Sequence, residues 1–207
     1  MAGLATLAIA ALIGVAAVVL WLRGDARLTG TPLGETAAPD FTLHDAGGAP
    51  FSLQQFRGRA VVLTFLYTSC PDVCPAIAAR LHDAAGKLGS AAAKVVFVAV
   101  SVDPEGDTPQ SVAQFTHEHG LDALGERWRY GLGSRDDLAA VWHAYGIGAE
   151  PQPAALAALR PDPSRPPVID HNAVLYLIDR RGRERVLLEP DVTTDALVHD
   201  LKQIAGD

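Results

Sequence analysis

Cysteine is nearly absent from this sequence: of 207 residues, only Cys70 and Cys74 carry a thiol. Two thiols are too few for a disulfide-rich scaffold or for a four-cysteine zinc site. Positive charge is also scarce, because 17 Lys and Arg face 24 Asp and Glu, for a net charge of −7. A protein whose main partner is nucleic acid needs a basic face for the phosphates, so we expect no nucleic-acid partner.

Charged side chains are missing altogether from the first 22 residues. As a helix rising 1.5 Å per residue, this stretch would reach about 33 Å, enough to cross the hydrocarbon core of a bilayer. The alternative is a cleaved signal peptide, but no Lys or Arg precedes the apolar run and no A-x-A site follows it. We therefore expect one transmembrane anchor at residues 1–23 and a linker over residues 24–38. Arg23 and Arg27 follow the span, and by charge bias alone they would leave the rest of the chain in the cytoplasm.

From residue 39 onward, strand and helix signals alternate. Continuous apolar runs at 60–67 and 94–102 are typical of strands covered on both faces. Two short apolar segments around Gly47 predict a hairpin. Start and stop signals predict helices over 76–88, 108–120, 134–145 and 193–204, and further strands over 128–132, 173–178 and 185–188. This order predicts an α/β domain over residues 39–207, a thioredoxin-like sandwich with an N-terminal hairpin. The carboxyl ends of its parallel strands would open onto one edge of the sheet, where ligands usually bind.

The two cysteines lie in the segment T-S-C-P-D-V-C-P, residues 68–75, between a predicted strand and a predicted helix. A helix start offers free N–H groups and a positive dipole end, and both favour thiolate over thiol. Pro75 would break a helix that had already formed, so we place it near the first helical position, with Cys70 to Cys74 in an irregular loop. The spacing suits either a disulfide or the binding of one soft cation. A purely structural disulfide is disfavoured, because so small a ring constrains little chain entropy.

One histidine, His171, stands at the start of a predicted strand, after a Pro-rich loop expected over residues 149–167. Two thiolates and one imidazole suit copper, above all Cu(I), whereas a closed zinc site needs a fourth ligand. Asp72, Asp103 and Asp170 are candidates for an oxygen ligand or for a hydrogen bond to a ligand, and turn or cap chemistry is the alternative for each. The other six histidines are expected in surface or packing roles.

Three separated segments resemble the Sco/SenC family of copper-binding assembly factors for cytochrome c oxidase. They are C-P-D-V-C-P at 70–75, S-V-D-P-E at 101–105 with D-T-P at 107–109, and D-H at 170–171 followed by L-Y-L-I-D at 175–179 and Gly182. Their order and spacing match the family over the soluble domain, and an N-terminal anchor fits the family too. Asn172 stands where the family usually has Ser or Thr, and Gly106 where a charged residue is common; neither change removes a ligand.

The resemblance implies a thioredoxin-like fold in which Cys70, Cys74 and His171 bind copper, as Cu(I), Cu(II) or both. It implies a membrane-anchored copper chaperone that delivers the ion to the dinuclear copper centre in the copper-bearing subunit of cytochrome c oxidase. Other copper chaperones and a thiol reductant are further expected partners. It also implies a single-pass protein of the bacterial inner (plasma) membrane with its domain on the periplasmic side, against the charge bias at Arg23.

Two other classes of function remain open from the residues alone. The first is a thiol–disulfide oxidoreductase, in which Cys70 and Cys74 form a redox pair that reduces the cysteines of the oxidase copper site. The second is a copper sensor or a bare structural module. His171 discriminates between a copper site and a pure dithiol reductase, because the reductase has little use for an imidazole.

Overall fold

The computed structural model describes residues 28–151 and 169–206. The anchor expected at residues 1–23 lies outside these ranges. Among the described residues, no helix combines the length and the apolar character needed to cross a membrane.

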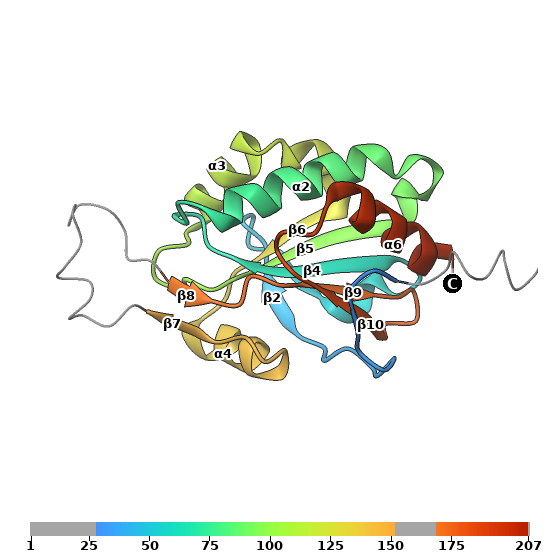
Figure 1. Ribbon diagram of the computed structural model, residues 1–207. Coiled ribbons are helices and arrows are strands. Elements are labelled where there is room, and N and C mark those ends of the chain that lie inside the picture. The colour runs from blue at the N-terminus through green and yellow to red at the C-terminus, as the bar shows by residue number, and fades with distance from the viewer. Residues whose placement is uncertain (1–27, 152–168, 207) are drawn as a thin grey trace, which may run out of the picture.

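A six-stranded mixed sheet forms the centre of the domain (Figure 1). Its strands follow the order Thr31–Pro32 (β1), Glu184–Leu188 (β10), Leu175–Ile178 (β9), Ala60–Leu66 (β4), Val95–Ser101 (β5) and Trp128–Gly131 (β6). β4, β5 and β6 run parallel, and the remaining pairs are antiparallel. Every residue of β4 and β5 is buried, as expected for apolar strands covered on both faces.

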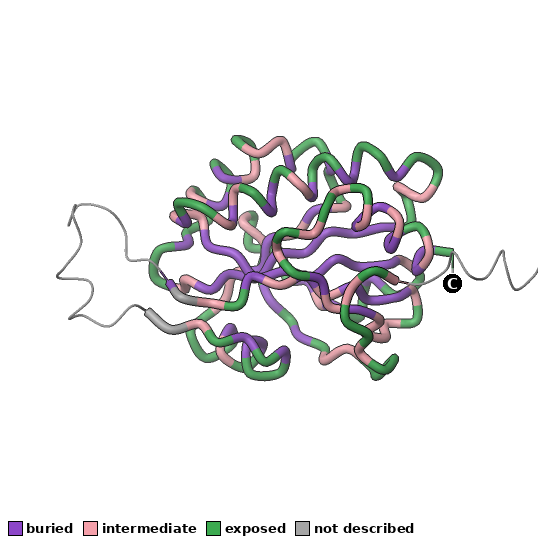
Figure 2. The backbone as a smooth tube through the Cα atoms, viewed as in Figure 1, coloured by how far each residue is buried: buried purple, intermediate pink, exposed green. Residues whose placement is uncertain are grey.

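Helices cover both faces of this sheet (Figure 1). α2 (Val73–Lys87), α3 (Pro109–Glu118) and α6 (Thr194–Gly206) lie on one face; α4 (Arg135–Ala144) and the hairpin of β2 (Thr42–His44) and β3 (Pro50–Ser52) lie on the other. Short 3₁₀ helices connect these elements: η1 (Leu53–Phe56), η2 (Gly89–Lys94) and η3 (Leu121–Arg127). Buried residues run along the strands and the inner faces of the helices (Figure 2). The predicted α/β sandwich with an N-terminal hairpin is thus confirmed.

Two helices begin at the predicted capping residues. Thr108 caps α3, with its hydroxyl oxygen accepting the backbone N–H of Ser111 at 3.1 Å and with Pro109 at the first helical position. Ser134 caps α4 in the same way, accepting from the backbone N–H of Asp137 at 3.2 Å. Each cap satisfies an N–H group that has no partner within the helix.

The start of α2 differs from the prediction. The helix begins at Val73, three residues before the expected position 76, so Cys74 lies in the first helical turn and not in an irregular loop. Pro75 also lies in this turn. It is tolerated there because an N–H in the first turn has no intrahelical acceptor, so its absence costs no hydrogen bond.

The second half of the predicted linker is attached to the domain. β1 pairs with β10 and forms one edge of the sheet, and Thr29 donates its backbone N–H and its hydroxyl to the buried carboxylate of Asp200, at 3.1 and 2.8 Å. Gly30 packs so closely that a Cβ atom there would lie 2.2 Å from a carbonyl oxygen of β10. Residues 29–38 are therefore not a free tether, in contrast to the linker expected over 24–38. Gly30 in this segment allows close packing and does not provide flexibility.

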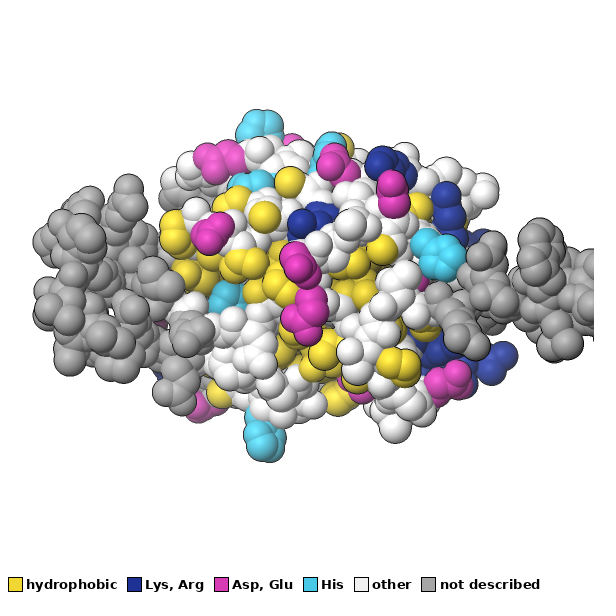
Figure 3. Space-filling view, viewed as in Figure 1, with side chains coloured by type: hydrophobic (Ala, Val, Ile, Leu, Met, Phe, Trp, Pro, Cys, Tyr) yellow, Lys and Arg dark blue, Asp and Glu magenta, His cyan; other side chains and the backbone are white. Residues whose placement is uncertain are grey.

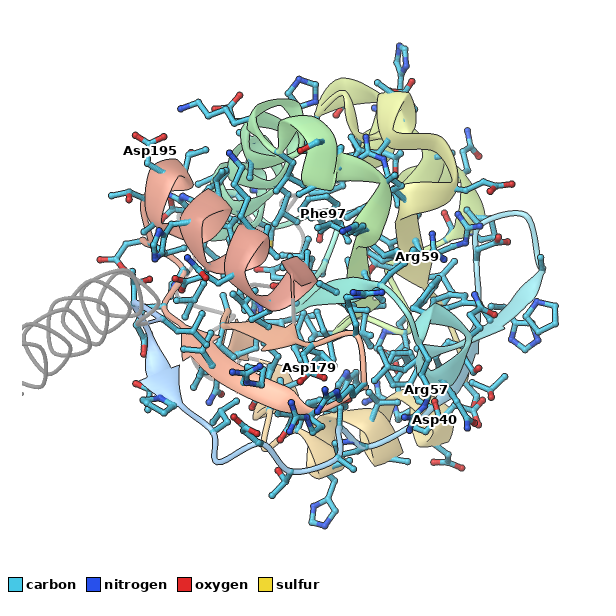
Figure 4. All side chains as sticks on the ribbon, turned by 90° about the vertical axis from the view of Figure 1, so that its right-hand side faces the viewer. Asp40, Arg57, Arg59, Phe97, Asp179 and Asp195 are labelled. Carbon is cyan, nitrogen blue, oxygen red and sulfur yellow. The ribbon has the colours of Figure 1, made fainter. Side chains whose placement is uncertain are left out.

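Asp179 closes the turn between β9 and β10, where a turn was predicted (Figure 4). One carboxylate oxygen accepts the backbone N–H groups of Arg181 and Arg183, at 2.9 and 3.0 Å, and the other pairs with the Arg183 guanidinium at 2.7 Å. Arg57 donates to the carbonyl oxygen of Arg181 at 2.6 Å. These contacts fasten the end of the sheet where β4 begins.

A separate two-stranded ribbon flanks the Pro-rich segment. β7 (Ala149–Pro151) pairs antiparallel with β8 (Ile169–His171), which places Ala149 opposite His171. The first residues of the predicted loop over 149–167 are therefore paired, and residues 152–168 lie outside the described ranges. His171 thus belongs to a strand that is not part of the six-stranded sheet.

Candidate metal centre

The cysteine segment begins where β4 ends, at the edge onto which β5 also opens. The backbone N–H of Val102 donates to the carbonyl oxygen of Leu66 at 2.9 Å, so the carboxyl ends of the two parallel strands lie together as predicted. The backbone N–H of Cys70 then donates to the carbonyl oxygen of Tyr67 at 3.3 Å and turns the chain toward α2. Cys70 consequently precedes the helix, and Cys74 lies in its first turn.

Both cysteines are free and buried, with 7% and 0% of Cys70 and Cys74 exposed. The sulfur of Cys70 accepts a hydrogen bond from the Cys74 backbone N–H at 3.4 Å. The pKa of Cys70 falls to about 5, chiefly because the Cys74 thiol also donates to it; the Asp72 backbone N–H and the Tyr67 hydroxyl contribute in the same direction, and burial opposes them. The start of α2 therefore stabilises one thiolate, as helix N-termini do for reactive cysteines.

Cys74 has the opposite electrostatics. Its pKa is raised far above the usual thiol value, first because its proton is shared with Cys70, and also by burial and by the negative charge of the Cys70 thiolate. The reduced site thus holds one thiolate and one thiol. The preference for thiolate expected at the helix start applies to Cys70 only. A metal that binds both sulfurs must displace the Cys74 proton.

His171 contacts Tyr67, which lies three residues before Cys70, and it is not assembled into a ligand set with the cysteines. Its ring packs edge-on against Tyr67, with the ring centroids 5.6 Å apart and the planes at 76°. Its Nδ1 is 3.2 Å from the carbonyl oxygen of Ile169, and its Nε2 is 3.1 Å from that of Phe65. A carbonyl oxygen accepts only from a protonated nitrogen, so the ring must leave one of these contacts before a lone pair is free for a metal. Within the described part of the chain, no three His, Cys, Asp or Glu side chains already stand together as a metal site.

The three aspartates predicted near the ligands have different surroundings. Asp72 is the N-cap residue of α2, and its exposed side chain makes no cap hydrogen bond; its backbone N–H, not its carboxylate, serves Cys70. Asp103 accepts the backbone N–H of Gly106 at 2.9 Å, which is the turn chemistry named as its alternative. A Cβ at Gly106 would lie 2.1 Å from that carboxylate, so a larger residue here would have to displace the side chain of Asp103. The side chain of Asp170 lies outside the described residues, although its backbone is part of β8.

Asp107 is the polar residue that the sequence did not single out. Its carboxylate is only 7% exposed and accepts four hydrogen bonds: from the backbone N–H and the hydroxyl of Thr68, both at 2.8 Å, from the hydroxyl of Ser101 at 2.6 Å, and from that of Tyr130 at 2.8 Å. Burial raises the pKa of Asp107 while these four donors oppose the rise. The carboxylate therefore joins the ends of β4, β5 and β6 directly beneath the cysteine segment. The D-T-P pattern contained this aspartate, but it read as the approach to a helix cap.

Together, the fold and the site define a thioredoxin-like domain with a C-x-x-x-C dithiol at the carboxyl edge of its parallel strands. The SCO1/SenC family model matches residues 30–206, and the chain belongs to this family. The structure of Bradyrhizobium japonicum ScoI with copper bound is similar at a TM-score of 0.67 and 28% identity, covering 82% of this chain and 99% of that one. Apo Sco1 from Thermus thermophilus gives a TM-score of 0.69 at 30% identity, covering 85% of this chain and 96% of that one.

Curated relatives extend the comparison to mitochondrial proteins. The human mitochondrial SCO1 homologue is 26% identical over 147 residues, which cover 65% of this chain and 45% of the human protein. The mouse mitochondrial SCO2 homologue is 29% identical over 145 residues, which cover 69% of this chain and 52% of the mouse protein. The chain thus spans about half the length of these mammalian relatives.

Proposed function

We propose that this chain is a membrane-tethered copper chaperone that binds copper through Cys70, Cys74 and His171 and delivers it to the dinuclear copper centre of cytochrome c oxidase. The observation that carries the proposal is the buried dithiol itself: Cys70 and Cys74 are joined by a hydrogen bond at a helix start, and the neighbouring Tyr67 contacts the imidazole of His171. Membership of the SCO1/SenC family and the likeness to a copper-bound relative support the choice of metal.

The donor set fits copper better than harder ions. Thiolate sulfur is a soft ligand that favours Cu(I), and an imidazole nitrogen suits both Cu(I) and Cu(II). Because Cys70 is already a thiolate, binding releases a proton from Cys74 only, and the cost of that deprotonation makes copper retention depend on pH. The bound ion is the cargo. The chain supplies two sulfurs that a recipient thiolate can replace one at a time.

His171 has to change its contacts for this role. Its ring rests on Tyr67, which borders Cys70, so the imidazole is near the dithiol while its nitrogens face the carbonyl oxygens of Phe65 and Ile169. Copper binding would exchange a carbonyl contact for a metal bond. The proposal therefore includes a small rotation of His171 on loading.

The membrane tether and its side belong to the same proposal. Residues 1–23 would anchor the chain in a bacterial inner membrane, with the domain on the outer side. Because Thr29 is fixed to Asp200, the free linker shrinks to residues 24–28, which span at most about 18 Å. A reporter enzyme fused to the C-terminus tests the side: activity only in the cytoplasm would contradict it.

Copper stoichiometry and affinity test the central claim. The reduced chain should bind one Cu(I), measured against a chromophoric competitor, and His171→Ala should weaken binding far more than His143→Ala. His143 is a matched control because it is an exposed histidine on α4, on the other face of the sheet. Equal effects of the two substitutions would remove His171 from the site.

Deletion of the gene tests delivery in the cell. We expect lower oxidase activity and less copper in its dinuclear centre, with partial recovery when copper is added to the medium. Normal copper loading of the oxidase in a clean deletion strain would contradict the delivery role.

A thiol–disulfide oxidoreductase is the second candidate, favoured by the unequal pKa values of the two cysteines. The Cys70 thiolate would attack a target disulfide, giving a mixed disulfide and one target thiolate. Cys74, on losing its proton, would then attack the Cys70 sulfur and release the second target thiolate. The target gains two electrons, the chain ends as a disulfide, and a thiol reductant restores it. His171→Ala should leave this activity intact while it weakens copper binding, which separates the two functions.

A further inference from the structure

Tyr67 contacts both parts of the proposed site, although the sequence drew attention to it only as the end of a strand. It is 1% exposed and follows β4 directly. Its carbonyl oxygen accepts the backbone N–H of Cys70 at 3.3 Å, and its ring meets the ring of His171 edge-on at 5.6 Å. One residue therefore contacts both the cysteine segment and the imidazole.

The hydroxyl of Tyr67 holds β8, the strand that carries His171. The backbone N–H of Ile169, in β8, donates to the Tyr67 hydroxyl oxygen at 3.3 Å. β8 pairs with β7 and is not a member of the six-stranded sheet. Among the described residues, only two hydrogen bonds link β8 to the segment that ends in the cysteines: this one and the contact of His171 Nε2 with the Phe65 carbonyl oxygen.

These two links have different fates when the proposed copper site forms. If His171 turns from a carbonyl oxygen to the metal, its contact with the Phe65 carbonyl oxygen can break. The hydrogen bond between Tyr67 and Ile169 involves no ligand atom and can remain. The Tyr67 carbonyl oxygen accepts from the backbone of Cys70 while the Tyr67 hydroxyl accepts from Ile169, so both contacts can persist when copper is bound. Tyr67 thereby limits the separation between Cys70 and the strand that presents the imidazole.

We propose that Tyr67 is a positioning residue: its carbonyl oxygen holds Cys70, its hydroxyl holds β8, and this bridge keeps His171 within reach of the dithiol while the imidazole changes partners. This inference rests on the proposed copper site for its consequence, but the bridge itself exists without metal. Pre-organisation of this kind raises affinity by reducing the ordering that binding must impose.

Tyr67→Phe removes only the hydroxyl and keeps the ring against His171. We expect copper binding to weaken about tenfold, since one hydrogen bond contributes roughly a tenfold factor. Tyr176→Phe is the matched control, because it also removes one buried phenol hydrogen bond, to the carbonyl oxygen of Tyr145 at 2.5 Å, away from the cysteines. That variant should bind copper like the unmodified chain.

A double-mutant cycle separates positioning from general stability. If Tyr67 acts through His171, the tenfold effect of Tyr67→Phe should nearly vanish in a His171→Ala background. A penalty of the same size in both backgrounds would show that Tyr67 does not act through the imidazole, and the proposal would be wrong.

One readout needs no copper. In metal-free Tyr67→Phe, amide hydrogen exchange at Ile169 should accelerate, whereas Tyr176→Phe should leave it unchanged. Unchanged exchange in Tyr67→Phe would overturn the bridge. A chain that binds no copper but shows the faster exchange would refute the proposed function and leave the bridge in place.

Discussion

The backbone N–H of Cys74 donates to the sulfur of Cys70 at 3.4 Å, and together with the stronger effect of the Cys74 thiol it makes the two cysteines chemically unequal. We predict that Cys70 alone is alkylated by iodoacetamide between pH 5 and 8. Its pKa of about 5 keeps it a thiolate above that pH, and the reaction should slow tenfold per pH unit below it. Cys74 should stay a thiol across the range, because its pKa is raised.

Tandem mass spectrometry of the labelled peptide measures this asymmetry. The chain unfolded in urea is the control, in which both thiols should titrate near the ordinary value of about 8.5. Equal labelling of Cys70 and Cys74 in the folded chain, or a folded-state midpoint near 8.5 for Cys70, would contradict the assignment of the thiolate.

Much of the fold was predictable because its signals are local. β4 and β5 could be recognised since strands covered on both faces need unbroken apolar runs. The starts of α3 and α4 could be recognised since Thr108 and Ser134 cap them with their own side chains. The pairing of these strands then placed the cysteine segment at the edge where ligands usually bind.

The remaining features depend on contacts between residues far apart in the sequence. Gly30 indicated a flexible linker, yet its missing side chain allows close packing on β10. Pro75 suggested that α2 begins two or three residues later than Val73, because a proline is tolerated anywhere in the first turn. The partners of His171 lie on β4 and on its own strand, and no local pattern predicts that its nitrogens face carbonyl oxygens.

Asp107 should contribute strongly to stability. Asp107→Ala removes the acceptor of four hydrogen bonds at the strand ends, and of these donors the Tyr130 hydroxyl keeps a second acceptor, the carbonyl oxygen of Leu66. We therefore expect the free energy of unfolding to fall by about 2–5 kcal/mol. Urea unfolding followed by tryptophan fluorescence measures the loss. Asp137→Ala is the control, because this exposed carboxylate accepts from Ser134 at the cap of α4 and its removal should cost less. A loss no larger than that of the control would contradict the buried network.

Two glycine-to-alanine substitutions should change the free energy of unfolding in opposite directions. Gly30→Ala places a Cβ 2.2 Å from the Leu187 carbonyl oxygen, so it should lower the free energy of unfolding by about 1–3 kcal/mol and weaken the pairing of β1. In Gly86→Ala, near the end of α2, the new Cβ meets no atom within 4 Å. This substitution should raise the free energy of unfolding by about 0.5–1 kcal/mol. Thermal unfolding compares them directly. A neutral Gly30→Ala would mean that residues 29–38 are not held against the sheet.

Oxidation of the dithiol should switch copper retention off. Diamide takes two electrons from Cys70 and Cys74, the one proton of Cys74 and a second proton from solvent, and leaves a disulfide, which offers no thiolate to a metal. We expect the oxidised chain to retain no Cu(I) after gel filtration, with no thiol titratable in denaturant, and reduction with a phosphine followed by Cu(I) should restore one bound ion.

His143→Ala, which leaves both sulfurs in place, should behave like the unmodified chain in this cycle, whereas Cys74→Ser should lose copper without any oxidant. Copper that stays bound after complete loss of both thiols would place the ion elsewhere. Cys74 keeps its proton until copper binds or diamide oxidises the sulfur, so copper and diamide compete for the same sulfur. Copper added first should therefore slow the reaction with diamide.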